Sequence, residues 1–115
     1  KKDFKKYDVI LLPTWKLDLL KNIKFDLFIN IASFQEMEKQ QSLLYLKFFN
    51  KKTKFIYLKN AINGHSRTKD KGKFGVINPT RMMDCEKVLK RTHRIISKEI
   101  FNYNKNYRLL LKNNT

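Results

Sequence analysis

Glycine, cysteine and long apolar runs are all scarce in this sequence of 115 residues. Three glycines, none of them closely spaced in a phosphate-loop pattern, exclude a dinucleotide or Walker fingerprint. The single cysteine, Cys85, excludes an internal disulfide framework and a cysteine-rich zinc site. The chain has only two histidines, His65 and His93, so few side chains remain that could serve as ligands of a metal ion. No apolar run approaches the roughly 18 residues of a membrane-spanning helix, so we expect no membrane span.

The length and the charge narrow the choice further. The chain suits one domain, residues 1–115, because domains run to about 100–150 residues. An apolar content of 42% is enough for a core. The net charge is +16, but 21 of the 26 basic residues are lysines scattered over the whole chain. The densest stretch runs from Lys51 to Lys73. Either these lysines form a solvated surface, or they form a basic patch of a nucleic-acid-binding module.

Apolar runs alternate with amphipathic segments along the chain. Two runs, Asp8–Leu12 and Phe25–Ile31, are typical of strands buried on both faces, and Lys54–Lys59 predicts a third strand. Two further strands with a hairpin between them are predicted near the end. The strands of this hairpin are expected at 93–103 and 107–112. Helices are expected at 16–22, from Ser33 to about Asn50, and at 84–90. This order predicts an α/β fold with a parallel sheet and a C-terminal antiparallel hairpin.

Polar residues gather directly after the predicted strands. They occur at Pro13–Trp15, at Asn30–Ser33 and at Asn60–Asn63, where a loop-like stretch, Asn60–Gly75, begins. Parallel sheets bind ligands at the carboxyl ends of their strands. The sequence therefore predicts a binding site in this place.

Two residues of this region are candidates for acid–base chemistry. Glu36 could act as a general base near a hydroxyl, or it could be the capping-box partner of Ser33 at the start of a helix. His65 lies in a polar loop beside a glycine, where it is either a base or a plain surface histidine. We expect His93, which precedes an apolar strand, to be structural, and Cys85 to be inert.

Three more residues are candidates for ligand contacts. Asn30, near the end of a strand, either holds a ligand amine or hydroxyl or satisfies neighbouring backbone groups. Ser33 is either a contact or a helix cap. Trp15 either covers an adenine or sugar ring or anchors the core.

One segment resembles a known signature. Residues 25–37 resemble Asp-Leu-Phe-Ile-Asn-x-x-Ser-Phe-Gln-Glu-Met, the signature of a bacterial family of sugar O-methyltransferases. Three flanking features also fit this family: the terminal hairpin, Phe55–Asn60 after the signature, and Ile10-Leu11-Leu12-Pro13 with Trp15 before it. The resemblance therefore spans about Asp8 to Lys112.

That family is similar to class I S-adenosylmethionine-dependent methyltransferases, which have a seven-stranded Rossmann-like sheet. The resemblance implies that Asp8–Leu12, Phe25–Ile31 and Lys54–Lys59 are the third to fifth strands and that the hairpin supplies the last two. It implies S-adenosylmethionine as cofactor, bound by Asn30, Ser33 and Trp15. It also implies a sugar or glycan-precursor substrate, whose hydroxyl proton a base such as Glu36 or His65 could take, so we expect these two as the catalytic residues. We also expect a cytoplasmic location.

This sequence has no counterpart of the first two strands of that sheet. It therefore also has no counterpart of the glycine-rich loop and the acidic strand end, which hold the cofactor in that family. In the class I sheet these two strands lie between the third and fourth strands. The chain also does not begin with methionine. We therefore expect this chain to be a fragment, the C-terminal portion of a longer methyltransferase. Its partner would be the missing N-terminal part of the same enzyme. Alone, the fragment should bind the cofactor poorly and catalyse nothing. The alternatives are a truncated or degenerate inactive remnant and a small basic nucleic-acid-binding module.

Overall fold

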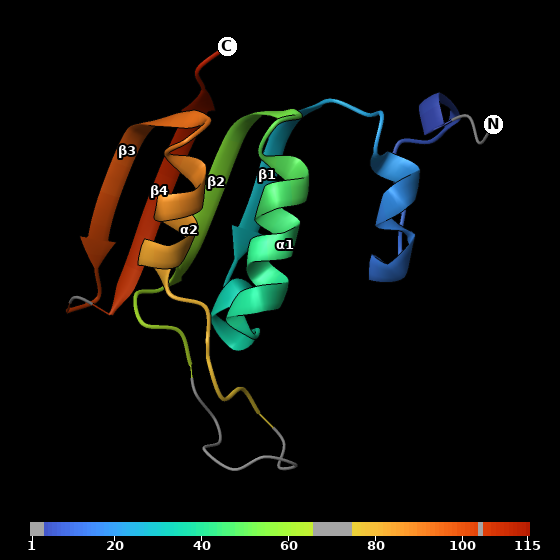
Figure 1. The fold of residues 1–115 in the computed structure, drawn as a ribbon. Coiled ribbons are helices and arrows are strands. Elements are labelled where there is room, and N and C mark those ends of the chain that lie inside the picture. Colours follow the sequence, from blue (N-terminus) through green and yellow to red (C-terminus); the bar gives the residue numbers. More distant parts are fainter. Residues whose placement is uncertain (1–3, 66–74, 104) are drawn as a thin grey trace.

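Four strands form one mixed sheet in the order β1-β2-β4-β3 (Figure 1). The computed structural model describes residues 4–65, 75–103 and 105–115. The strands are β1 (Phe25–Ile31), β2 (Thr53–Ala61), β3 (His93–Phe101) and β4 (Asn106–Asn113). β1 and β2 are parallel, whereas β4 pairs antiparallel with both β2 and β3. The prediction of an α/β fold with a C-terminal antiparallel hairpin is therefore confirmed.

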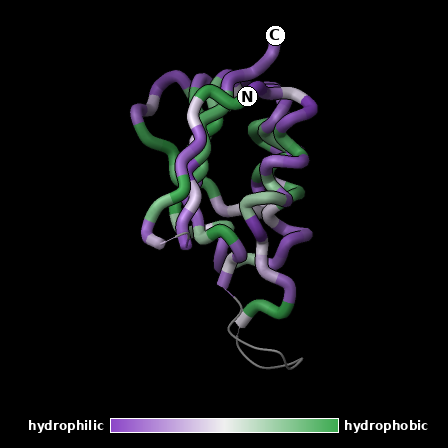
Figure 2. The backbone as a smooth tube through the Cα atoms, turned by 90° about the vertical axis from the view of Figure 1, so that its left-hand side faces the viewer, coloured by the Kyte–Doolittle hydropathy of each residue, from purple (hydrophilic) through white to green (hydrophobic). Residues whose placement is uncertain are grey.

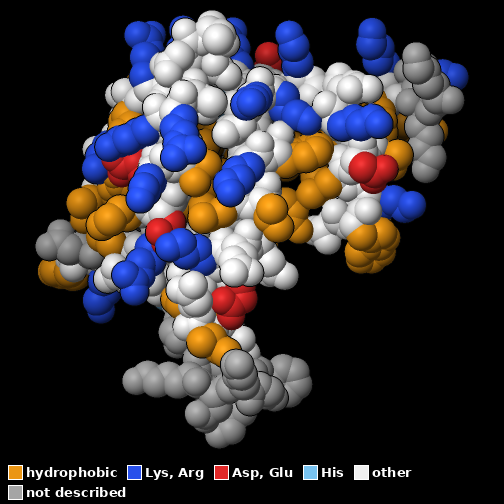
Figure 3. Space-filling model, viewed as in Figure 1, with side chains coloured by type: hydrophobic (Ala, Val, Ile, Leu, Met, Phe, Trp, Pro, Cys, Tyr) orange, Lys and Arg blue, Asp and Glu red, His pale blue; other side chains and the backbone are white. Residues whose placement is uncertain are grey.

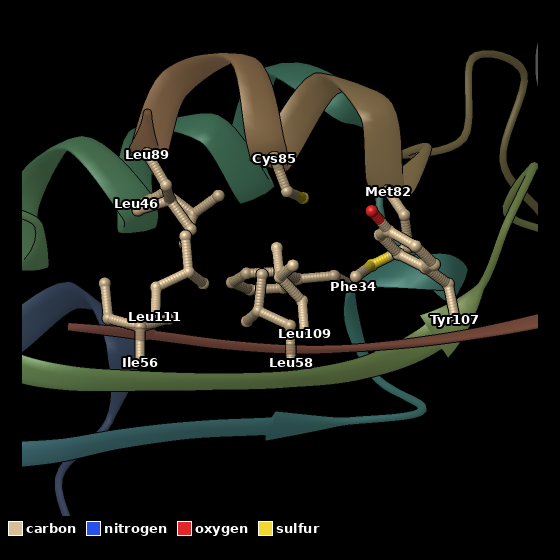
Figure 4. Close-up of a cluster of buried hydrophobic side chains, with 10 residues drawn as sticks. All are labelled: Phe34, Leu46, Ile56, Leu58, Met82, Cys85, Leu89, Tyr107, Leu109 and Leu111. Atoms are coloured by element: carbon tan, nitrogen blue, oxygen red, sulfur yellow. The ribbon is translucent and has the colours of Figure 1, made fainter. Parts of the chain in front are cut away.

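Two α-helices cover the same face of the sheet, and the turned view separates them from the strands (Figures 1 and 2). They are α1 (Lys39–Phe49), between β1 and β2, and α2 (Met82–Leu89), between β2 and β3. Their apolar side chains point at those of β2 and β4 (Figure 4). The core between the two layers consists of Phe34, Leu46, Ile56, Leu58, Met82, Cys85, Leu89, Tyr107, Leu109 and Leu111.

The opposite face of β1 is open, and this corrects the expectation that β1 is buried on both faces. Leu27, Ile29 and Ile31 alternate along the strand on that face and are 49%, 55% and 53% exposed. β1 is also an edge strand, because β2 is its one strand partner within the described part of the chain. A parallel strand with one free edge and one bare apolar face is unusual, since such strands normally lie inside a sheet.

Residues 8–12 do not form the predicted strand. They run between two short 3-10 helices, η1 (Phe4–Lys6) and η2 (Thr14–Leu20), and pair with no described strand. Leu11 in this run is 91% exposed. An apolar run forms a strand only where a neighbour supplies backbone hydrogen bonds, and the described part of the chain supplies no such neighbour to this run. η2 replaces the helix expected at 16–22 and lies on the outer side of α1 (Figure 1).

The basic side chains do not gather in one place on the face that the helices cover (Figure 3). Lysine and arginine side chains are spread over this view, between patches of apolar surface. Much of the dense stretch from Lys51 to Lys73, and of the loop expected at Asn60–Gly75, lies outside the described residues, because 66–74 are not among them. Among the described residues, no helix has both the length and the apolar character needed to cross a membrane.

His93 is structural, as expected, and its burial makes stability depend on pH. Its ring is enclosed where β3 begins and donates from Nε2 to the Thr53 carbonyl at 3.0 Å, while Nδ1 accepts from the Thr92 hydroxyl at 2.8 Å. Burial lowers the pKa of His93 below its ordinary 6.5, although the bond to Thr53 partly opposes this. The folded state therefore keeps the ring neutral at pH values where the unfolded chain binds a proton.

We expect the free energy of unfolding to fall as the pH drops below about 6.5, the ordinary histidine value at which the unfolded chain begins to take up the proton. The loss ends at the lower pKa of the folded state. Urea unfolding at pH 7.5 and 5.5 measures the difference. His93→Gln should be less stable at both pH values, because it alters a buried hydrogen bond, but its stability should change less between them. An equal change in both proteins would contradict this assignment.

Candidate functional site

The segments that follow β1 and β2 meet at one end of the sheet. β1 and β2 are parallel and in register, with Ile31 opposite Lys59, so their carboxyl ends lie side by side. The chain leaves β1 into a short 3-10 helix, η3 (Phe34–Glu36), and leaves β2 into a turn that reaches His65. These two segments therefore come together at the carboxyl ends of the strands, where the sequence predicts the site.

The turn after β1 is sharp and strained. Ala32 has a φ of 51°, in the left-handed region that residues with a Cβ rarely occupy. Directly after it, the Phe34 N–H donates to the Asn30 side-chain oxygen at 3.1 Å. Asn30 thus satisfies neighbouring backbone, the second of its two predicted roles. The backbone turns back over the strand end and carries η3 toward β2.

Replacing Ala32 with Gly should stabilise the protein by roughly 1 kcal/mol, since glycine adopts a positive φ without the Cβ clash. Thermal or urea unfolding of the two proteins measures the change. Ala61→Gly, at a buried position on β2, is the matched control and should be destabilising. A lower stability for Ala32→Gly would show that the turn carries no strain.

Gln35 and Asn60, two buried amides, fasten η3 to the end of β2. Gln35 accepts a hydrogen bond from the Ala61 N–H at 2.7 Å, and the Gln35 N–H lies 3.4 Å from the Asn60 side-chain oxygen. The Asn60 amide donates in turn to Asn30 at 3.1 Å. Sequence reasoning did not single out Gln35 and Asn60, although Gln35 lies within the signature segment and Asn60 directly follows the predicted strand Lys54–Lys59.

Glu36 and His65, the two predicted catalytic residues, are in direct contact. Glu36 Oε1 lies 2.8 Å from His65 Nδ1. The His65 backbone N–H also donates to the Gln35 carbonyl at 2.8 Å, which fixes the loop beside η3. Glu36 is partly buried and His65 is exposed, so the pair lies at the surface, with its carboxylate on the inner side.

The contact sets the tautomer of the imidazole. A carboxylate oxygen accepts only, so Nδ1 must carry the proton for the 2.8 Å hydrogen bond to form. Gln35 Nε2 is also 3.4 Å from Nδ1, but it is a donor and pairs instead with Glu36 Oε1 at 3.5 Å. In the neutral ring Nε2 then has a free lone pair. A carboxylate behind a histidine in this way makes a general base that can take a proton at Nε2.

The capping box predicted for Ser33 and Glu36 does not form. Ser33 makes no side-chain cap bond within the described structure, and α1 begins six residues later, at Lys39. Glu36 turns to His65 instead of to the Ser33 backbone. Glu38 precedes α1, and its carboxylate accepts from the N–H groups of Ile77 and Asn78. Ser33 itself is exposed beside the turn.

Trp15 is not brought to the site. It is 79% exposed on η2, on the outer side of α1, and so is not a core anchor either (Figure 1). Asn30 is beside the site, but its side-chain oxygen already accepts two hydrogen bonds. The residues expected to hold S-adenosylmethionine therefore do not form a complete site for it in the described structure.

No metal centre accompanies the pair: the residues that the structure describes contain no group of three His, Cys, Asp or Glu side chains that could hold an ion. Cys85 is a buried residue of α2, and burial raises the pKa of its thiol to about 12, which makes it inert as expected. The contact between Glu36 and His65 is suited to proton transfer at the imidazole. Comparison with protein-family models, curated proteins and solved structures finds no match to this chain.

Proposed function

We propose that this chain carries the acceptor-activating half of an S-adenosylmethionine-dependent O-methyltransferase that acts on a sugar hydroxyl. The observation that supports this most strongly is the 2.8 Å contact between Glu36 and His65 at the carboxyl ends of β1 and β2. A sugar hydroxyl is a weak nucleophile, and a base that takes its proton makes the oxygen able to attack a methyl group.

The resemblance and the site share three polar residues. The segment that resembles the methyltransferase signature contains Asn30, Gln35 and Glu36, and in the structure these are the residues that turn the chain, fasten it to β2 and hold His65. His65 lies outside the signature. A signature whose polar residues build one site is easier to understand as functional than as structural alone.

The chain's own residues have separate tasks in the proposed reaction. The sugar hydroxyl donates its proton to His65 Nε2, and Glu36 stabilises the imidazolium that forms. Gln35 and Asn60 hold η3 and the end of β2 at a fixed spacing, so that the base does not need to reorganise. The described residues do not make a complete site for the methyl donor.

The rest of the donor site would come from further strands of the same enzyme. The resemblance puts two missing strands between the strand expected at Asp8–Leu12 and the strand that corresponds to β1. On that side, β1 has no partner strand among the described residues. Its open face, with Leu27, Ile29 and Ile31, offers the apolar surface that such a part would cover. The proposed partner is therefore the N-terminal part of the same protein.

The test is a methyl-transfer assay on the protein as its source cell makes it. The protein is incubated with S-adenosylmethionine labelled in its methyl group and with a panel of free sugars and sugar nucleotides, and the products are analysed by mass spectrometry. A labelled methyl group on a sugar oxygen supports the proposal. Label on nitrogen or carbon alone, or no label on any sugar while the protein binds the donor, would contradict it.

A further inference from the structure

A groove lies between α2 and the edge strand β3, and no residue of the Glu36–His65 site lines it. Its volume is about 450 Å³, within the range of roughly 300–1,000 Å³ that is typical of small-molecule sites. The groove exists because α2 covers β2 and β4 but leaves the outer part of β3 bare (Figure 1). Its apolar lining is made by Ile62, Met82, Met83, Ile100 and Tyr107.

A buried carboxylate holds two lysines at the groove. Glu86 Oε1 lies 2.9 Å from Nζ of Lys90, the residue that directly follows α2, and Glu86 Oε2 lies 3.4 Å from Lys98 Nζ on β3. The Tyr107 hydroxyl donates to Glu86 Oε2 at 2.5 Å. Burial raises the pKa of Glu86, but the hydrogen bonds from Tyr107 and Lys90 and the charge of Lys98 lower it by more, so this carboxyl is ionised at neutral pH.

The lining is therefore apolar with an excess of positive charge. Three lysines, Lys87, Lys90 and Lys98, lie against one glutamate. Each ammonium group has three N–H donors, and Glu86 occupies one on Lys90 and one on Lys98. Lys87 takes no part in this network. Donors thus stay available beside a surface of methionine, isoleucine and tyrosine.

We propose that this groove binds a small organic anion with an apolar body and a carboxylate head. The body lies against Met83, Ile100 and the Tyr107 ring, and the head pairs with the lysines at the rim. Glu86 is a positioning residue, because it fixes Lys90 and Lys98 from two different elements. Methionines suit such a site, since their flexible side chains adapt to ligand shape.

A second groove in the same structure shows what sets this one apart. It lies between η2 and α1, has a volume of about 340 Å³ and is lined by Leu17, Gln41, Leu44, Tyr45 and Phe48. It is apolar, but no charged side chain lines it. An anion that is drawn to apolar surface alone would enter both grooves, whereas the proposed ligand should prefer the lysine-rimmed groove.

The test is an NMR titration of the 115-residue chain with octanoate, with 1-octanol as the uncharged analogue. We expect octanoate to shift amide signals of α2 and of residues 98–100 and to bind at least tenfold more tightly than octanol. Shifts confined to β1 or to α1, equal affinity for octanol, or no binding at 10 mM octanoate would each overturn the proposal.

Two charge variants separate the groove from the general positive charge. Lys87→Gln should weaken octanoate binding about threefold, since an exposed charge contributes up to about 1 kcal/mol. It should leave stability unchanged, because Lys87 is outside the Glu86 network. Lys47→Gln removes the same charge from an exposed position on α1 and should leave the affinity unchanged. Equal effects of the two variants would show diffuse attraction to the net charge of +16.

Discussion

Replacing His65 with Gln should lower the rate of methyl transfer to the sugar by about 10²–10⁴-fold, the range over which a positioned base acts. Glutamine can still donate a hydrogen bond to Glu36, but it cannot take up the proton of the hydroxyl at neutral pH. The loss should appear in kcat and in kcat/KM together, because the interaction is made in the transition state. Steady-state kinetics with the sugar identified in the assay measures it.

The fold should survive this change, which makes the kinetic result clear. His65 is exposed, and surface substitutions usually change stability by less than about 0.5 kcal/mol. Thermal unfolding of the variant is the check. Lys47→Gln on α1 is the kinetic control and should keep the wild-type rate. A rate for His65→Gln within twofold of wild type would mean that His65 is a plain surface histidine.

Replacing Leu58 with Ala should destabilise the protein by about 3 kcal/mol. Leu58 lies on β2, the central parallel strand, and is fully enclosed between the sheet and the helices (Figure 4). Truncation removes its apolar contacts and leaves a cavity among side chains that two helices hold in place. The unfolding midpoint in urea gives the change, which is a large part of the about 5–15 kcal/mol that stabilises a typical domain.

The matched control is Leu44→Ala on α1. Leu44 is 66% exposed, so the same truncation there should cost less than about 0.5 kcal/mol. If the two variants lost equal stability, the core would not lie where the structure places it. A loss at Leu58 near zero would have the same meaning.

The elements with strong local patterns could be predicted from the sequence. The apolar run Phe25–Ile31 coincides with β1, and the run 54–59 lies inside β2. The two terminal strands and their hairpin were also predicted, because aromatic and β-branched residues there flank a polar turn. Each of these segments finds a partner strand in the described structure, so local preference and tertiary context agree.

The predictions that were wrong concern features that depend on contacts between distant parts of the chain, which a local sequence pattern cannot show. Residues 8–12 have the composition of a strand but pair with no described strand, so they form no strand and most of them are exposed. Ser33 and Glu36 have the spacing of a capping box, yet Glu36 pairs with His65, 29 residues away in the chain. The sequence shows the spacing of a capping box, but it does not show that His65 competes with the Ser33 backbone for the Glu36 carboxylate.

The candidate site could be predicted in part for the same reason. Its place at the strand ends follows from the α/β order, and Glu36 and His65 were both named as candidates. Their contact depends on the register of β1 against β2 and on the bonds of Gln35 and Asn60, which no single segment encodes. Trp15 does not reach the site, because the strand predicted at 8–12, which ends shortly before it, does not form.

The most direct test of the central claim is a double-mutant cycle on the rate of sugar methylation. The rates of wild type, Glu36→Gln, His65→Gln and the double variant are measured under the same conditions. If Glu36 acts through His65 as one base, the double variant should be no slower than His65→Gln, because the carboxylate has no separate task. If the two losses multiply, or if Glu36→Gln keeps the wild-type rate, the pair does not work as a unit and the account is contradicted.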